Sequence, residues 1–160
     1  MKILLISESH GARRELLHLL QYEKYDRVIF LGNYCSDLES LPFKHNFPPI
    51  VVRGFRDPFH NKPIEIRTKI GEYMFHITNG YNFNVKDDGI KKMIDYARVR
   101  DIDCVLFGDD ENEFVKLIGS VWFINPGAFG VVHNDKKTYA IMNIDKYGIQ
   151  TEIKTYNACV

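Results

Sequence analysis

The first residues able to take part in binding or catalysis are Glu8 and His10, which follow the apolar run 3–6 directly. A continuous apolar run of this kind is typical of a buried strand of a parallel sheet. Open α/β sheets place their ligands just beyond the carboxyl ends of such strands. The two side chains are two positions apart, so both can point into one crevice. On its own this pair is a weak signal, and a strand that runs into a solvated loop is the more common explanation of it.

Five other apolar runs also end in a short segment that combines glycine with polar groups. The six segments are Glu8-Ser9-His10-Gly11, Gly32-Asn33, Arg53-Gly54-Phe55-Arg56-Asp57, Thr78-Asn79-Gly80-Tyr81, Gly108-Asp109-Asp110-Glu111 and Asn125-Pro126-Gly127. Glycine permits tight turns and lets backbone approach a ligand closely. Six such segments in series, each after a strand, predict a common rim.

The hydrophobic pattern predicts the elements that carry this rim. We expect strands at 2–6, 27–31 and 50–52 with a helix over 12–22, which indicates a largely parallel sheet in the N-terminal half. A hairpin is expected over 64–78, and a helix beginning at Asp87-Asp88. Strands are expected at 103–107, 121–124, 139–144 and 149–155, whereas 36–48 has no clear period. Nothing divides the chain, so residues 1–160 are expected to form one domain.

Composition excludes several classes of function. The chain has 21 Lys and Arg residues and 21 Asp and Glu residues, so it has no net field to attract nucleic acid or an anionic membrane. No apolar stretch reaches the ~18 residues of a membrane span. Cys35, Cys104 and Cys159 are odd in number and widely spaced, which favours reduced thiols in a cytoplasmic protein. The sequence has no P-loop, no G-x-G-x-x-G and no G-x-S-x-G motif. Cys35 does not begin a C-x5-R motif, which excludes a tyrosine-phosphatase loop.

The order and spacing of the six segments resemble the calcineurin-like metallophosphoesterases, in particular their small bacterial and archaeal phosphodiesterase branch. That branch shows D-x-H-G, G-D, G-N-C-D, T-H-G-H, G-H-T-H and I-N-P-G-S. Matching positions extend over residues 1–132, and Ile124-Asn125-Pro126-Gly127 matches literally. The resemblance implies an α/β fold in which two packed mixed β-sheets are flanked by helices, a metallo-dependent phosphatase-like sandwich.

The resemblance also places the metal-binding positions of the family on this chain. The first metal position (Glu8, His10, Asn33 and Glu111) corresponds to Asp, His, a bridging Asp and His in the family. The second metal position (Asn33, Phe55, Asn79 and Asp109) corresponds to the bridging Asp, Asn, His and His. Because Phe55 cannot coordinate a metal and Asn33 is neutral, we expect the second position to be lost. The first can hold one divalent ion, with Mn²⁺, Mg²⁺ or Ca²⁺ favoured over Zn²⁺ by the oxygen-rich set, or it can hold none.

The phosphate side of the family site differs as well. Arg56 is a candidate phosphate contact, because guanidinium groups bind phosphate well, and an ion pair with Asp57 is the alternative. Ala128 replaces the family's Ser after N-P-G. The main hypothesis is a metallophosphoesterase-fold protein with an eroded dinuclear centre, little or no phosphodiesterase activity and a role in binding or interaction. The alternative is an active phosphoester hydrolase that uses a single divalent metal.

The resemblance leaves the partner open between a phosphoester ligand and another protein. The small retromer subunit, which is similar to this branch, serves as a scaffold, so a role without catalysis has a precedent on this fold. Homodimers are common in the family, which makes a homodimer an expectation here too.

Overall fold

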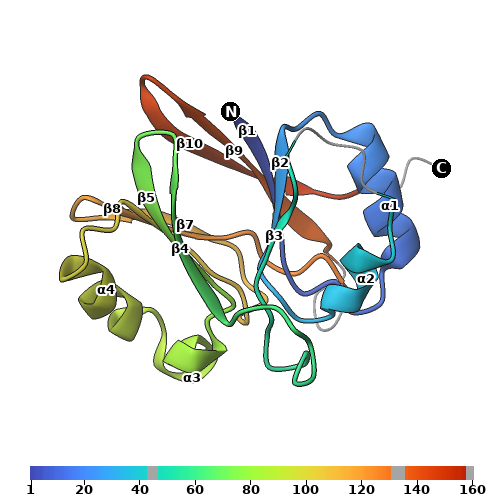
Figure 1. Ribbon diagram of the computed structural model, residues 1–160, viewed down its shortest axis with the longest axis horizontal. Coiled ribbons are helices and arrows are strands. Elements are labelled where there is room, and N and C mark those ends of the chain that lie inside the picture. The colour runs from blue at the N-terminus through green and yellow to red at the C-terminus, as the bar shows by residue number, and fades with distance from the viewer. Residues whose placement is uncertain (43–46, 131–135, 158–160) are drawn as a thin grey trace.

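Ten strands form two five-stranded sheets in the computed structural model, which describes residues 1–42, 47–130 and 136–157 (Figure 1). The first sheet has, in spatial order, β10 (Gly148–Thr155), β9 (Thr138–Asp145), β1 (Lys2–Ile6), β2 (Arg27–Phe30) and β3 (Ile50–Val51). The second has β4 (Glu65–Ile70), β5 (Tyr73–Thr78), β6 (Cys104–Leu106), β8 (Val121–Asn125) and β7 (Phe114–Ile118). The two sheets pack together with helices on their outer sides, so the predicted fold class is confirmed.

The sheets are mixed, and their parallel strands occupy the positions nearest the site. In the first sheet β1, β2 and β3 run parallel, and β9 and β10 add antiparallel pairs. In the second sheet β5, β6 and β8 run parallel, whereas β4 and β7 are antiparallel edge strands. Parallel strands end at the same edge of their sheet, so the loops after them are gathered there.

The core explains why the first apolar run is continuous. Successive side chains of a strand point to opposite faces. Ile3 and Leu5 therefore enter the core between the two sheets, and Leu4 and Ile6 enter a second core under α1 (Arg13–Tyr22) and α2 (Cys35–Glu39). A third core lies between the second sheet and α4 (Lys91–Arg98), with the 3₁₀-helix Tyr81–Phe83 and α3 (Val85–Asp88) beside it (Figure 1).

Three local predictions differ from the structure. The helix predicted to begin at Asp87-Asp88 is wrong: this pair ends α3, and α4 begins at Lys91. Gly89 separates the two with a φ of 67°, a conformation that side chains strongly disfavour. Helix α2 lies in the stretch that showed no period, and the edge strand β7 was not expected. β7 exposes Lys116 and Leu117, so it lacks the clear alternation of a half-buried strand.

Other expectations can be compared with the described residues only. Cys35 and Cys104 are free, buried thiols, and Cys159 lies outside the described residues. In the described ranges, no helix has the length and apolar character needed to cross a membrane.

His76 is a buried titratable group beside the third core. It is 1% exposed on β5, and its ring packs against those of Phe83 and Tyr96 at centroid distances of 5.8 and 4.6 Å. Burial lowers the pKa of His76, and the Glu65 carboxylate, 3.7 Å from Nε2, only partly opposes this effect. The folded protein therefore resists protonation that the unfolded chain accepts near pH 6.5.

We expect the free energy of unfolding to fall as the pH drops below about 6.5, by up to about 1.4 kcal/mol per pH unit from this residue. His76→Phe keeps the ring contacts and removes the titration, so it should flatten this loss between about pH 7.5 and 5.5. Chemical denaturation at each pH measures the effect. His60→Gln, which changes a histidine paired with Glu39, should leave the loss in place. Equal slopes for wild type and His76→Phe would contradict this account.

Candidate functional site

Five of the six predicted segments meet at one cavity of about 520 Å³. Its lining residues are Glu8, His10, Asn33, Phe55, Arg56, Tyr81, Asn84, Lys86, Asp87, Asp109 and Glu111. The sixth segment supports the cavity from behind. The Asn125 side-chain amide donates to the Asp110 carbonyl at 2.7 Å, and the Ser7 hydroxyl donates to the Gly127 carbonyl at 2.6 Å. The loops after both sheets therefore contribute to a single site.

A short polar chain runs through the middle of this cavity. His10 Nε2 lies 3.2 Å from Glu8 Oε2, and Asn33 Nδ2 donates to Glu8 Oε1 at 2.5 Å. Asn33 Oδ1 accepts a hydrogen bond from the Arg56 backbone N–H at 2.9 Å. Glu8 is only 3% exposed, so these contacts take the place of water around its carboxylate. One oxygen of Glu8 and both ends of the Asn33 amide have hydrogen-bond partners within the protein, whereas His10 Nε2, although 3.2 Å from Glu8 Oε2, has no hydrogen-bond partner among the described residues.

Asp109 brings a second carboxylate into the same space. Burial and the nearby charge of Glu8 raise the pKa of Asp109. Lys86 and a hydrogen bond from the Asn33 side chain act in the opposite direction without cancelling the rise. Asp87 and Glu111 also line the cavity, so four carboxylates face it. The interior of the site is consequently short of positive charge.

Four of the lining residues have a left-handed backbone. The φ values are 52° for Glu8, 45° for His10, 59° for Asn33 and 66° for Asp109. This conformation costs a non-glycine residue about 1–2 kcal/mol and concentrates at functional sites. Surrounding contacts must hold the segments in place: the Glu8 N–H donates to the Gly32 carbonyl, and the Glu8 carbonyl accepts from Gly130.

Two buried aspartates hold these loops together, a role that the sequence analysis assigned to neither of them. Asp57 accepts from the backbone N–H groups of Cys35 and Gly54, both at 2.9 Å, and thereby ties the loop after β2 to the loop after β3. Its carboxylate thus serves the backbone, and no ion pair with Arg56 occurs in the described residues. Asp37 accepts from the Ser9 hydroxyl at 2.7 Å and the Gly11 N–H at 2.8 Å. Asp57 stands in a glycine-containing segment, a signal that could have suggested this role.

Asn79, predicted at the second metal position, is placed differently from the other candidates. It is fully buried, and its side-chain amide donates to the Leu31 carbonyl at 2.7 Å. It does not belong to the residues that line the cavity. Its Oδ1 has no hydrogen-bond partner among the described residues. Asn79 therefore links the two sheets beneath the site.

Four lining residues were missed by sequence reasoning: Tyr81, Asn84, Lys86 and Asp87. They follow β5, where the helix boundary was misplaced. Tyr81 belongs to one of the six segments, although its residue type did not suggest a role, and its ring centroid lies 6.3 Å from that of Phe55. Phe55 is 70% exposed although it faces this cavity.

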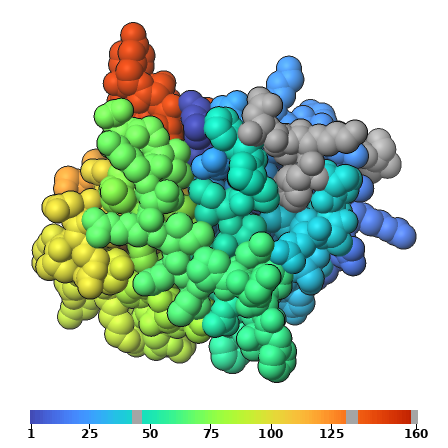
Figure 2. All heavy atoms as spheres, viewed as in Figure 1, coloured from blue at the N-terminus to red at the C-terminus, as the bar shows by residue number. Residues whose placement is uncertain are grey.

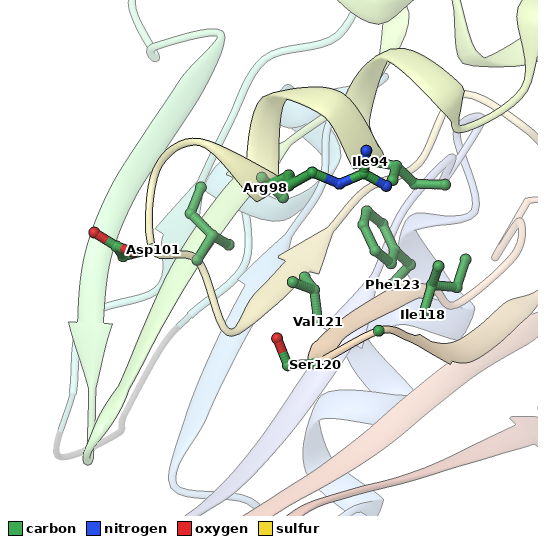
Figure 3. Close-up of a pocket in the computed structure, with 10 residues that line it drawn as sticks. Ile94, Arg98, Asp101, Ile118, Ser120, Val121 and Phe123 are labelled. Carbon is green, nitrogen blue, oxygen red and sulfur yellow. The ribbon is translucent and has the colours of Figure 1, made fainter.

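A second cavity, of about 240 Å³, lies between α4 and the turn that joins β7 to β8 (Figure 3). Ile118, Val121 and Phe123 form an apolar wall, with Arg98 and Asp101 toward the helix (Figure 3). None of the six predicted segments contributes to it. The first cavity is therefore the candidate functional site.

Comparison with known proteins agrees with this placement of the strand ends. Residues 1–147 match the family model of the calcineurin-like phosphoesterase superfamily domain. The chain belongs to this superfamily. A probable metallophosphoesterase of Mycoplasma genitalium is 25% identical over 142 residues, which cover 86% of this chain and 83% of that protein. The resemblance expected from the sequence is therefore confirmed.

Two solved structures show the shared fold. A conserved protein of Streptococcus pneumoniae, described as a predicted phosphoesterase, aligns with a TM-score of 0.77 and 23% identity over 96% of this chain and 88% of its own. The Vps29 protein of Entamoeba histolytica in complex with Zn²⁺ aligns with a TM-score of 0.71 and 19% identity, over 98% of this chain and all of that chain.

The donor set of this superfamily member does not fit a pair of metal ions. Across the described residues, no group of three His, Cys, Asp or Glu side chains is arranged to hold a metal ion. The Asn33 amide has its nitrogen against Glu8 and its oxygen against the Arg56 N–H, so neither end is free to bridge two cations. Phe55 contributes a hydrocarbon ring to the same wall.

The raised pKa of Asp109 leads to a prediction for metal-free protein in chelator. Because the folded state penalises ionised Asp109, Asp109→Asn should increase the free energy of unfolding at pH 7, by up to about 1 kcal/mol after solvent screening. The gain should shrink as acid protonates Asp109 in the wild type. Asp145→Asn, a change of the same chemistry far from the site, should have no such effect. A destabilised Asp109→Asn protein at pH 7 would contradict the charge balance described above.

Proposed function

We propose that this superfamily member is a binding or interaction module with an eroded dinuclear centre and little or no phosphodiesterase activity. The observation that carries the proposal is the placement of Asn33. Its position is the one that the family resemblance assigns to the bridging carboxylate, and its amide is fully engaged with Glu8 and Arg56. Two-metal phosphoesterases depend on a pair of cations that generate hydroxide and stabilise the attacking and leaving oxygens. A site without that pair loses most of its transition-state stabilisation.

The second metal position supports the same proposal. Phe55 cannot donate an electron pair to a metal, and Asn79 has committed its amide nitrogen to Leu31 beneath the cavity. Asp109 lines the cavity, but burial and the nearby charge of Glu8 raise its pKa and so disfavour the ionised form that binds a metal. Of the four residues at this position, none is therefore a free and well-placed ligand.

A protein partner fits the rim better than a small phosphoester does. Phe55 is 70% exposed and Phe59, in the same loop, is 100% exposed. This loop between β3 and β4 projects from the molecule (Figures 1 and 2). Exposed aromatic groups are common anchors of protein interaction sites. The four lining carboxylates would moreover repel a phosphate, and Arg56 and Lys86 are the Arg and Lys residues of the lining that counter that charge.

The alternative function, a single-metal phosphoester hydrolase, has its own supporting observation. Glu8, His10, Asn33 and Glu111 all line one cavity together with Arg56. After local rearrangement, Glu8, His10 and Glu111 would hold one divalent ion, with Asn33 adding an oxygen, and Mn²⁺, Mg²⁺ or Ca²⁺ suits these donors better than Zn²⁺. Such an ion would supply Lewis acidity. Arg56 would bind the phosphate oxygens through its guanidinium group.

The metal content of the purified protein is the first measurement that bears on the proposed function. We expect protein purified without chelator to contain at most one tightly bound divalent ion per chain, because Asn33, Phe55 and Asn79 cannot form a second site. Elemental analysis by inductively coupled plasma mass spectrometry, with protein quantified by amino-acid analysis, measures the ratio. Two equivalents of Mn²⁺ or Zn²⁺ that survive gel filtration would contradict the assignment of these positions.

Phosphodiesterase activity is the second measurement, and it distinguishes a binding module from a single-metal hydrolase. We expect hydrolysis of bis-p-nitrophenyl phosphate with added Mn²⁺ to be ~10³-fold or more below that of a dinuclear enzyme, since one metal and the bridging carboxylate are missing. Glu8→Ala and Arg56→Ala, prepared in parallel, give the background. A turnover near 1 s⁻¹ that disappears in Glu8→Ala would overturn the binding-module proposal and favour the alternative.

A further inference from the structure

One wall of the cavity is a short segment, residues 81–88, that comprises the 3₁₀-helix after β5 and helix α3 (Figure 1). It contributes four of the lining residues, which are Tyr81, Asn84, Lys86 and Asp87. Gly80 and Gly89 bound the segment with φ values of 107° and 67°, and Asn84 divides it with a φ of 55°. Because these left-handed positions separate the segment from the strand and the helix on either side, side-chain contacts must hold it against the second sheet.

Two buried side chains, Phe83 and Val85, attach this wall segment to the third core. The ring of Phe83 packs against the imidazole of His76, with the ring centroids 5.8 Å apart and the ring planes at 83°. His76 is almost fully buried, and neither of its ring nitrogens has a hydrogen-bond partner among the described residues. A neutral imidazole tolerates such a place far better than a charged one, since burial of an unpaired charge is very costly.

A second connection between His76 and the wall segment runs through Glu65 on β4. Oε2 of Glu65 accepts a hydrogen bond from the Asn82 side-chain amide at 3.3 Å and lies 3.7 Å from His76 Nε2. The Asn82 amide is oriented by the Thr78 hydroxyl, which donates to its Oδ1 at 3.0 Å. A protonated imidazole forms stronger hydrogen bonds to a carboxylate than an amide does, so it would compete with Asn82 for this oxygen.

The remaining charged groups around His76 oppose its protonation in the folded protein. Arg67 lies opposite His76 in the β4–β5 pair, and Arg100 follows α4. Both guanidinium groups lower the pKa of His76, as burial does, and Glu65 acts in the other direction. Tyr96 of α4 packs on the same ring, with the centroids 4.6 Å apart. His76 is therefore held neutral while the wall segment covers it.

We propose that His76 is a pH-sensitive switch for this wall of the cavity: the neutral ring keeps residues 81–88 in place, and protonation releases them. In the released form water reaches the imidazolium, and Glu65 pairs with it in place of Asn82. An exposed histidine has a pKa near 6.5, so opening of the segment becomes easier as the pH falls below about 6.5. The consequence for binding rests on the proposed function, because a partner seated in the cavity loses this wall at acid pH.

Hydrogen exchange measured by NMR tests the proposal on wild type and His76→Phe, without any ligand. The backbone N–H groups of Phe83, Asp88 and Gly89 are hydrogen-bonded inside or beside the segment and report on its opening. After correction for intrinsic exchange, their protection in wild type should fall about five- to tenfold between about pH 7.5 and 5.5. In His76→Phe, which keeps the ring contacts but cannot be protonated, the change should be less than about twofold. At both pH values the segment should be less protected than the amides of β1, as expected for local opening.

His18→Phe is the matched control, because it makes the same change on α1, against the first sheet, and should keep the wild-type pH dependence. Three results would overturn the inference: equal protection of the segment and of β1, wild-type protection that does not change with pH, or an undiminished pH dependence in His76→Phe. Each of them leaves the proposed binding role intact, since that role is tested separately by metal content and phosphodiesterase activity.

If His76→Phe does not fold, the wild-type protein decides. The ring protons of His76 and the backbone amide of Lys86 should then titrate in NMR spectra with one shared midpoint, below about pH 6.5. Different midpoints, or a Lys86 amide that does not respond while His76 titrates, would contradict the coupling. A His76 ring that stays neutral down to about pH 4.5 would contradict it as well.

Discussion

The buried negative charge where the two sheets meet is the constraint on which the rest of the site depends. Glu8 follows the central strand of one sheet and Asp109 follows the central strand of the other, and the packing of the sheets brings both to one cavity. Glu8 is almost fully buried, so its charge must be balanced inside the protein. Asn33 donates a hydrogen bond to one Glu8 oxygen, His10 contacts the other, and the Arg56 N–H orients Asn33.

The fold provides the rigidity that this balance needs. Interlocking cores on both faces of β1 keep its carboxyl end fixed. Asp57 and Asp37 then bind the backbone of the neighbouring loops, and Gly54 allows the close approach to Asn33. Because left-handed residues at 8, 10, 33 and 109 cost free energy, they persist only where packing and hydrogen bonds hold them. The orientation of the side chains in the cavity therefore depends on the packing of both sheets and on the hydrogen bonds between their loops.

Much of this architecture could be predicted from the sequence, since apolar runs and glycine-rich strand ends are strong local signals. The two-sheet fold and the superfamily were predicted correctly, and the strand ends with Glu8, Asn33 and Asp109 were rightly expected to meet. Features that depend on tertiary contact could not be predicted. Gly89 divides a stretch that has a helical pattern, β7 is an exposed edge strand, and Asp57 is buried by loops distant in sequence. Residue types also could not show that the Asn33 nitrogen donates to Glu8 while its oxygen accepts from the Arg56 backbone.

The most direct test of the account is an experimental structure from crystals soaked in MnCl₂, with anomalous diffraction recorded at the manganese edge. The account predicts no anomalous peak between Glu8 and Asp109, and it predicts Asn33 Nδ2 within hydrogen-bond distance of Glu8 Oε1. Two peaks about 3.5–4 Å apart, with the Asn33 side chain turned so that Oδ1 lies between them, would contradict it.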